Sequence, residues 1–105
     1  MAERIEVHGT DRWASRFFQH VIDHAAALAM TRWGNYVVQQ FLQHNERRRD
    51  CALSMLPLAK KIVSTKSGFF VLRFGLTQCD EGMRAMFEEC RGNNRQIFRA
   101  TRRWQ

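Results

Sequence analysis

The stretch Gly34-Asn35-Tyr36-Val37-Val38-Gln39 has a weaker copy, Gly68-Phe69-Phe70-Val71-Leu72-Arg73, 34 residues further along the chain, from position 34 to position 68. Repeats of this period are typical of solenoids, in which each unit buries its apolar face only against the next unit. The sequence therefore predicts a stack of similar units, and it directs the search for function to one face of that stack.

The two copies agree best at positions that a helix would bury. The matching apolar pairs are Val37 with Val71, Val38 with Leu72, Leu42 with Leu76, Leu28 with Ile62, Ala52 with Met86 and Leu53 with Phe87. Polar positions agree less, because Asn35 aligns with Phe69 and Gln39 with Arg73. Stacked units share a core while their outer faces diverge, so we predict these pairs as core positions.

The composition is that of a soluble, single-domain protein. The chain has 105 residues, of which 45% are hydrophobic and 26% charged. Its longest apolar run, 25–30, is far shorter than the roughly 18 residues of a membrane span, and residues 1–11 show no targeting pattern. Cys51, Cys79 and Cys90 form no C-x-x-C pair, so we expect buried thiols in an intracellular, reducing compartment, either cytoplasmic, nucleolar or organellar.

Helices dominate the predicted secondary structure, because the chain has few alternating stretches and a single proline, Pro57, which suits a first helical position. We expect Asn45 to cap one helix and Gly92 to end another. The predicted helices cover residues 12–22, 23–29, 34–44, 46–56, 57–63, 68–77, 80–90 and 94–104.

The predicted organisation is an N-terminal tail, 1–11, followed by a helical repeat domain, 12–105. Within the domain, 23–56 and 57–90 are full units, and partial units lie at 12–22 and 91–105. Because repeat arrays usually need about three units for stability, the chain is either a piece of a longer solenoid or a small protein held by an RNA or protein partner.

Three helices per unit, with x-Gly-Asn-Tyr-Val-Val-Gln on the middle one, resemble the Pumilio (PUF) repeat over residues 12–98. The resemblance implies an all-α, right-handed solenoid that binds single-stranded or structured RNA on its concave face. In that family Asn-Tyr-x-x-Gln is associated with uracil. Divergent members such as the nucleolar Puf-A type hold structured RNA during ribosome assembly with little base code. Tetratricopeptide repeats share the period but expect a W-x-x-L-G-x-x-Y pattern that is missing here.

Asn35, Tyr36 and Gln39 are the leading candidates for RNA contact. Asn35 and Gln39 are four residues apart and so share one helix face, where two amides could pair with the edge of a base while Tyr36 stacks on its plane. The alternatives are that both amides are solvated and that Tyr36 packs in the core.

The second copy keeps only part of this pattern. Phe70 could stack on a base, and Arg73 could hydrogen-bond a base or phosphate. Phe69, however, replaces Asn35 and has no hydrogen-bonding group. The alternative is that Phe69 and Phe70 pack against an adjoining unit or protein.

The charge balance is consistent with a phosphate-binding partner. Seventeen Lys and Arg against ten Asp and Glu give a net charge of +7, which would favour RNA and make binding sensitive to salt. Arg32 and Lys66 occupy equivalent positions before the two middle helices, where they could meet phosphates. A further basic face, which could also be merely solvated, comprises Arg91, Arg95, Arg99, Arg102 and Arg103.

The sequence does not favour an enzyme. His20 and His24 have the spacing of two zinc ligands but lack H-E-x-x-H and a third ligand nearby, and no set of residues resembles a nucleophile with its base. We expect Trp33 in the core, no cofactor, no metal and no small-molecule substrate. The expected partner is RNA, either mRNA in post-transcriptional regulation or rRNA. The alternative is a structural component of a ribonucleoprotein, with protein subunits as partners and no base-specific reading.

Overall fold

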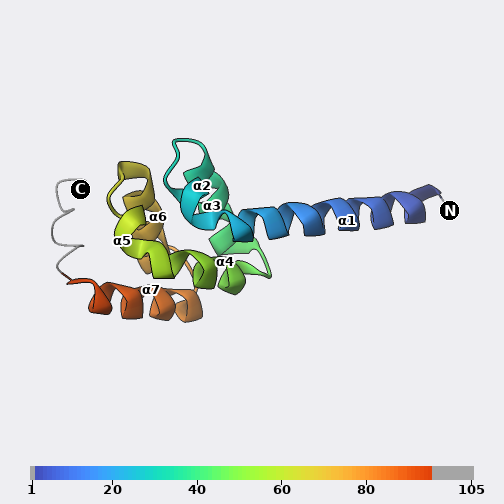
Figure 1. Cartoon of the computed structure of the whole chain (residues 1–105). Helices are drawn as coiled ribbons and strands as arrows, with labels where there is room; N and C mark the ends of the chain where they lie inside the picture. Colours follow the sequence, from blue (N-terminus) through green and yellow to red (C-terminus); the bar gives the residue numbers. More distant parts are fainter. Residues whose placement is uncertain (1, 96–105) are drawn as a thin grey trace.

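The computed structural model describes the backbone of residues 2–95 and the side chains of residues 12–95. Helices make up the described part of the chain, which contains no strand (Figure 1). In chain order they are α1 (Ala2–Asp23), α2 (Ala25–Ala29), α3 (Gly34–His44), α4 (Arg48–Met55), the 3-10 helix η1 (Leu56–Leu58), α5 (Ala59–Ile62), α6 (Lys66–Thr77) and α7 (Glu81–Asn93). The predicted all-α repeat array is confirmed.

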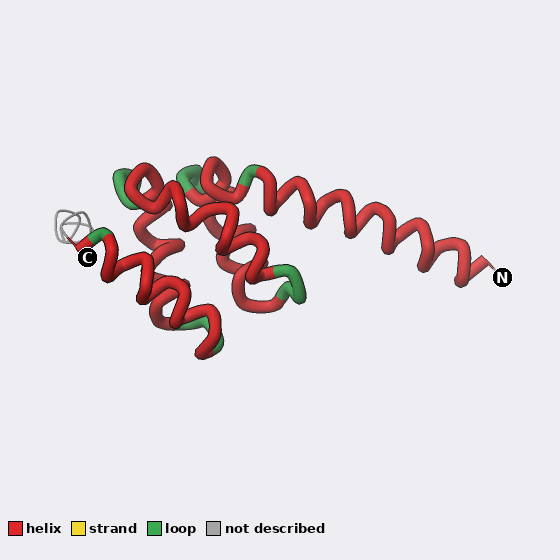
Figure 2. The backbone as a smooth tube through the Cα atoms, turned by 60° about the horizontal axis from the view of Figure 1, so that its bottom comes forward, coloured by secondary structure: helices red, strands yellow, loops and turns green. Residues whose placement is uncertain are grey.

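The helices follow one another in the same order twice, first α2, α3 and α4, then α5, α6 and α7. Corresponding helices lie side by side, because α2 contacts α5, α3 contacts α6 and α4 contacts α7 (Figures 1 and 2). The long helix α1 packs its C-terminal end mainly against α4 and projects away from the array. The boundaries of the units 23–56 and 57–90 stay a prediction.

The turn before each middle helix shows the 34-residue repeat in its hydrogen bonds. The Thr31 hydroxyl donates to Leu28 O at 2.9 Å and accepts from the Gly34 amide at 2.8 Å. The Thr65 hydroxyl makes the equivalent bonds to Ile62 O at 3.1 Å and from Gly68 at 3.0 Å. Each threonine therefore satisfies an amide that a helix start leaves without an intrahelical partner.

Gly34 and Gly68 are required at these turns by close approach. A Cβ at Gly34 would lie 2.5 Å from Leu28 O, and a Cβ at Gly68 would lie closer still to Ile62 O. Since the obstructing atoms are backbone, the neighbouring turn would have to move. Both glycines thus let the short first helix and the middle helix of each copy meet closely.

The core runs through the array between the paired helices. Its buried apolar residues are Val21, Ile22, Ala25, Ala29, Val38, Phe41, Leu42, Cys51, Ala52, Met55, Ala59, Ile62, Val63, Phe69, Val71, Leu72, Cys79, Met83 and Phe87. Most of the predicted core pairs are among them. Val37 and Leu53 are corrections, since they are 39% and 55% exposed on faces of α3 and α4 that no helix covers fully.

Several predicted boundaries were wrong. The first helix begins at Ala2 and not at Arg12, because Ala, Glu and Arg are good helix formers and no proline interrupts them. Asn45 does not occupy the cap position of α4, which falls to Arg47, although its side chain accepts from the Arg47 amide at 2.7 Å. Gly92 lies inside α7, which continues to Asn93. Most of the predicted helix 94–104 lies outside the described residues.

The three cysteines are free thiols. Cys51 and Cys79 are buried, as predicted, whereas Cys90 is half-buried. Burial raises the pKa of the Cys51 thiol to about 12 and, with a contribution from the charge of Asp80, that of Cys79 to about 11. Since the thiolate is the reactive form, these are inert packing residues.

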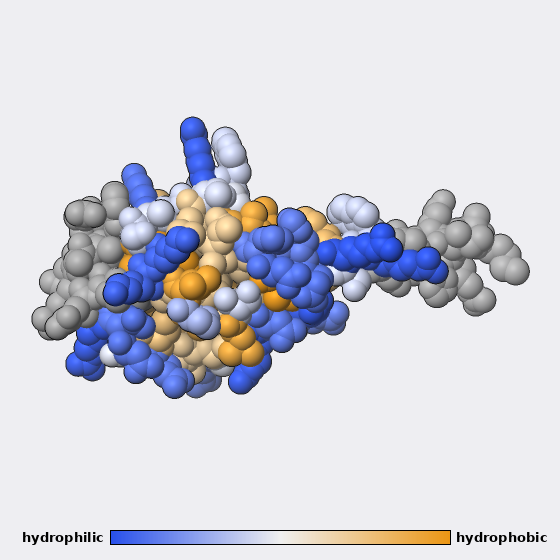
Figure 3. All heavy atoms as spheres, in the orientation of Figure 1, coloured by the Kyte–Doolittle hydropathy of each residue, from blue (hydrophilic) through white to orange (hydrophobic). Residues whose placement is uncertain are grey.

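The surface mixes apolar and charged areas. In Figure 3, hydrophilic side chains stand around an apolar area that overlies the repeat helices. None of the helices in the described part of the chain is both long and apolar enough to cross a membrane.

Candidate nucleic-acid interface

A groove lies between the two middle helices, α3 and α6, and we call it the α3/α6 groove. Its volume is about 390 Å³. The residues that line it are Asn35, Tyr36, Gln39, Phe70, Arg73, Phe74, Thr77 and Gln78. Five of the seven residues predicted from sequence to contact RNA are therefore brought together in one place, across 34 positions of sequence.

Asn35 forms the floor of the groove, not its open edge. The side chain is only 4% exposed, and its Nδ2 donates to Thr31 O at 2.8 Å and to Arg32 O at 2.7 Å. Both hydrogens of the amide nitrogen are thus used within the chain. The sequence suggested an amide that offers its own edge to a base, whereas the structure shows one that fixes the turn before α3.

Gln39 is the amide with free hydrogen-bonding capacity. Its Nε2 donates to Asn35 Oδ1 at 3.0 Å, and its side chain is half-buried. The bond orients the Gln39 amide and leaves its second N–H and its Oε1 for a ligand. A donor next to an acceptor matches the N3–H and O4 of uracil, whose Watson–Crick edge is exposed when the RNA is single-stranded.

Two aromatic rings flank this amide. Tyr36 on α3 is 59% exposed and Phe70 on α6 is 36% exposed, so both rings can meet a base. Phe69, by contrast, is 4% exposed and packs in the core of this chain. The packing interpretation is therefore correct for Phe69, and Phe70 keeps an accessible face.

The cations of the site lie at and above its rim. Arg73 lines the groove and is exposed, and it forms no ion pair within residues 12–95. The Lys66 Nζ lies 5.9 Å from the centre of the Phe70 ring. Arg32 lies 5.1 Å from the centre of the Trp33 ring, outside the groove lining.

Trp33 was expected in the core, but it is 72% exposed. The tight turn at Gly34 directs this side chain outward, where Arg32 covers it. The basic face predicted near the end of the chain is only partly described: Arg91 pairs with Glu88 at 2.6 Å and Arg95 is exposed, whereas Arg99, Arg102 and Arg103 lie outside the described residues.

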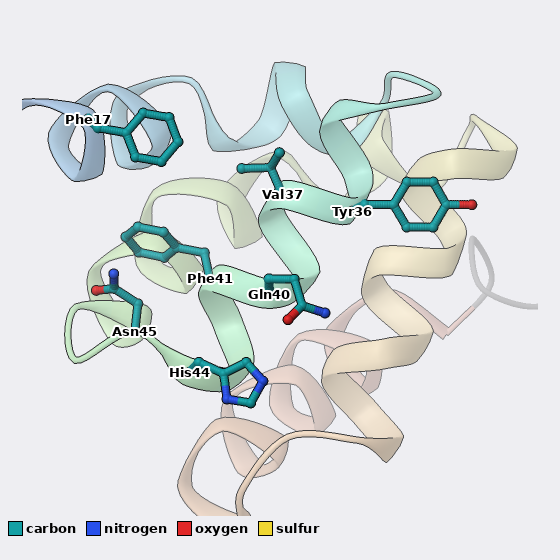
Figure 4. A pocket seen from close by; sticks show the side chains of 7 residues that line it. All are labelled: Phe17, Tyr36, Val37, Gln40, Phe41, His44 and Asn45. Carbon is teal, nitrogen blue, oxygen red and sulfur yellow. The ribbon is translucent and has the colours of Figure 1, made fainter. Parts of the chain in front are cut away.

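A second groove lies on the other side of α3, and we call it the α1/α3 groove. Its volume is about 490 Å³, and its lining comprises Phe17, Tyr36, Val37, Gln40, Phe41, His44 and Asn45 (Figure 4). In Figure 4, Phe17, Val37 and Phe41 lie between α1 and α3, while Tyr36 extends toward α6. Sequence reasoning missed this groove, because α1 was read only as a partial unit.

Comparison with known families agrees with this helical array of repeats. Residues 9–27 and 24–50 match the Pumilio-family RNA binding repeat. No curated protein and no solved structure matches the chain. The fold is thus that of a helical repeat protein, and residues 9–50 hold Pumilio-family RNA-binding repeats.

The match at 9–27 adds a copy that the 34-residue period did not reveal. Arg12-Trp13-Ala14-Ser15-Arg16-Phe17-Phe18-Gln19 shares its Arg, Trp and Gln with Arg32-Trp33-Gly34-Asn35-Tyr36-Val37-Val38-Gln39, at a spacing of 20 residues. The matched repeat is an RNA-binding module, so the finding also supports the expectation that the chain is not an enzyme. The second copy, Gly68 to Arg73, lies beyond the matched residues.

Proposed function

We propose that this protein binds single-stranded RNA through the α3/α6 groove and reads one base there. The observation that carries the proposal is the Gln39 amide, which is held by Asn35 and open to a ligand between two exposed rings. Uracil is the base proposed, from the chemistry of the amide and from the resemblance of Asn-Tyr-x-x-Gln to the uracil-associated pattern.

Each side chain has a distinct role in this proposal. Gln39 pairs with the base edge, and Tyr36 and Phe70 stack on the base or on its neighbours. Arg73 and Lys66 neutralise phosphates next to the groove, and Arg32 does so from the turn before α3. Asn35 acts through Gln39, because its own amide hydrogens are bound to backbone oxygens.

The test compares two RNAs and three proteins. Fluorescence anisotropy measures the affinity of a uridine-rich strand and of a scrambled strand for wild type, Gln39→Ala and an Asn35→Ala, Gln39→Ala double variant. Loss of the base contact should lower the affinity for the uridine-rich strand about fivefold to tenfold, with little change for the scrambled strand. Gln43→Ala, an exposed glutamine on the same helix outside the groove lining, is the matched control.

Equal affinities across all of these combinations would remove base reading from the proposal. Binding that remains strong and salt-dependent would then favour the second candidate, a structural component of a ribonucleoprotein, for example in ribosome assembly. One observation supports that candidate: the position equivalent to Asn35 is the buried Phe69, so only one of the two copies described here carries an amide pair. Crosslinking of the full chain in cells would identify mRNA or rRNA and any protein subunits, as well as the compartment.

A further inference from the structure

The α1/α3 groove and the α3/α6 groove are successive copies of one kind of site. Tyr36, Gln40 and His44 line the first, and the residues 34 positions later, Phe70, Phe74 and Gln78, line the second. The same face of the middle helix therefore borders a groove in each copy. What differs is the helix on the opposite side, α1 in one case and α3 in the other.

That difference leaves the α1/α3 groove more open. Val37 is 39% exposed, whereas its equivalent Val71 is fully buried. The cause is the placement of α1, which packs principally against α4 and not along α3 as α3 packs along α6. The face of α3 that borders α1 thus keeps apolar surface accessible.

The walls of this groove suit the flat face of a base. The Phe17 ring is 41% exposed and stacks on Trp13 with ring centres 5.6 Å apart and planes 2° apart. Val37 and Phe41 form the opposite wall, and exposed Gln40 and His44 stand at the rim (Figure 4). The groove contains no buried amide pair like Asn35 and Gln39, so it offers stacking and not fixed edge reading.

Cations are held at one end of the groove. Arg47 donates through its Nη2 to Gln19 Oε1 on α1 at 2.7 Å, and its backbone amide donates to Asn45 Oδ1. Arg48 Nη1 donates to Asn45 O at 3.1 Å. Two guanidinium groups are thereby fixed beside Asn45, where a phosphate that follows a bound base would be attracted.

We propose that the α1/α3 groove takes a second, unpaired base of the same RNA strand, held by stacking on Phe17 and indifferent to base identity. The inference rests on the proposed function, because it extends the strand bound in the α3/α6 groove. Continuity supports RNA as the occupant: Tyr36 lines both grooves, so a strand can pass from one to the other over this ring. The net charge of +7 points the same way.

The test measures how affinity depends on RNA length in paired variants. Fluorescein-labelled oligouridylates, from lengths that fill one groove to lengths that span both, are titrated against wild type and Phe17→Ala. The ratio of the two affinities should be near one for the shortest strand and rise to roughly tenfold for the long strands. Replacing the uridines outside the reading position by other bases should leave this ratio unchanged.

Gln40→Ala and the control Gln43→Ala keep the test decisive if Phe17→Ala unfolds, since both glutamines are exposed on α3 and only Gln40 lines the groove. Gln40→Ala should weaken long strands only, and Gln43→Ala should weaken none. A ratio of one at every length overturns the inference, including the case in which a protein helix occupies the groove, yet leaves the proposed function intact. If wild type binds no RNA at any length, the proposed function itself fails.

Discussion

The two middle helices, α3 and α6, share one scaffold and differ at the surface that they turn toward a ligand. Thr31 with Gly34 and Thr65 with Gly68 make the same hydrogen bonds. Asn35 and Phe69 are equally buried, at 4% exposed each, but one binds backbone oxygens and orients Gln39 while the other only packs. The comparison teaches that a position can keep its burial and lose its chemistry.

The largest expected effect concerns the shared scaffold. Gly68→Ala should lower the free energy of unfolding by about 3 kcal/mol, because the added Cβ meets the backbone oxygen of Ile62. Gly34→Ala should behave alike. Gly92→Ala is the control: it lies inside α7 with nothing within 4 Å of an added Cβ, so it should stabilise by about 0.5–1 kcal/mol. Urea denaturation followed by circular dichroism measures all three, and a neutral Gly68→Ala would contradict the equivalence of the turns.

A smaller effect should follow from making α6 resemble α3. In a Phe69→Asn, Arg73→Gln double variant, the new asparagine can donate to Thr65 O and Lys66 O, as Asn35 does to Thr31 O and Arg32 O. Preference for uridine-rich over scrambled RNA should rise about fivefold, while the slope of log affinity against log salt should fall by about one, since a cation is lost.

The Arg73→Gln single variant separates the two effects, because it should reduce the salt slope without the gain in preference. If the double variant folds but shows no gain, the amide pair is not what reads the base. Far-ultraviolet circular dichroism establishes whether each variant folds.

The smallest effect concerns the start of the third helix. Asp80 caps α7 by accepting from the Met83 amide at 3.0 Å, whereas α4 has no side-chain cap. This bond, and that from Arg48 Nε at 2.8 Å, hold the pKa of Asp80 below its ordinary value. A lowered folded-state pKa stabilises above the unfolded pKa, and the contribution is lost as pH falls through the lowered value.

Asp80→Asn keeps the cap and removes the charge, and Asp80→Ala removes both. At neutral pH the thermal midpoint should fall slightly for Asp80→Asn and by a few degrees for Asp80→Ala. The gap between wild type and Asp80→Asn should close as acid protonates the carboxylate. A gap that persists in acid would show that the charge of Asp80 does not stabilise the fold.

Much of the fold could be predicted from particular residues. The helix 34–44 was predicted with its observed bounds, and Pro57 lies at the start of the 3-10 helix as expected. Periodicity succeeded there because buried positions recur in both copies. It failed at Val37, Leu53 and Trp33, whose exposure depends on whether a neighbouring helix covers them, and this is a property of the array and not of one helix.

The candidate site was predicted in part for the same reason. Spacing placed Asn35 and Gln39 on one face, but it did not show that Asn35 points inward to Thr31 O while Gln39 keeps free hydrogen-bonding groups. The α1/α3 groove was missed entirely, because its walls come from Phe17 and from α3, and nothing in local sequence indicates how far apart those helices lie.

The sequence by itself determined the repeat, the helices and the residue types that could meet RNA, because these depend on local spacing and composition. Tertiary structure alone decided which of those residues meet: it joined Gln39 to Phe70 and Arg73 across one groove, buried Asn35 and Phe69, and left Tyr36 between two grooves. The physical reason is that exposure and partnership arise from the packing of helices distant in sequence.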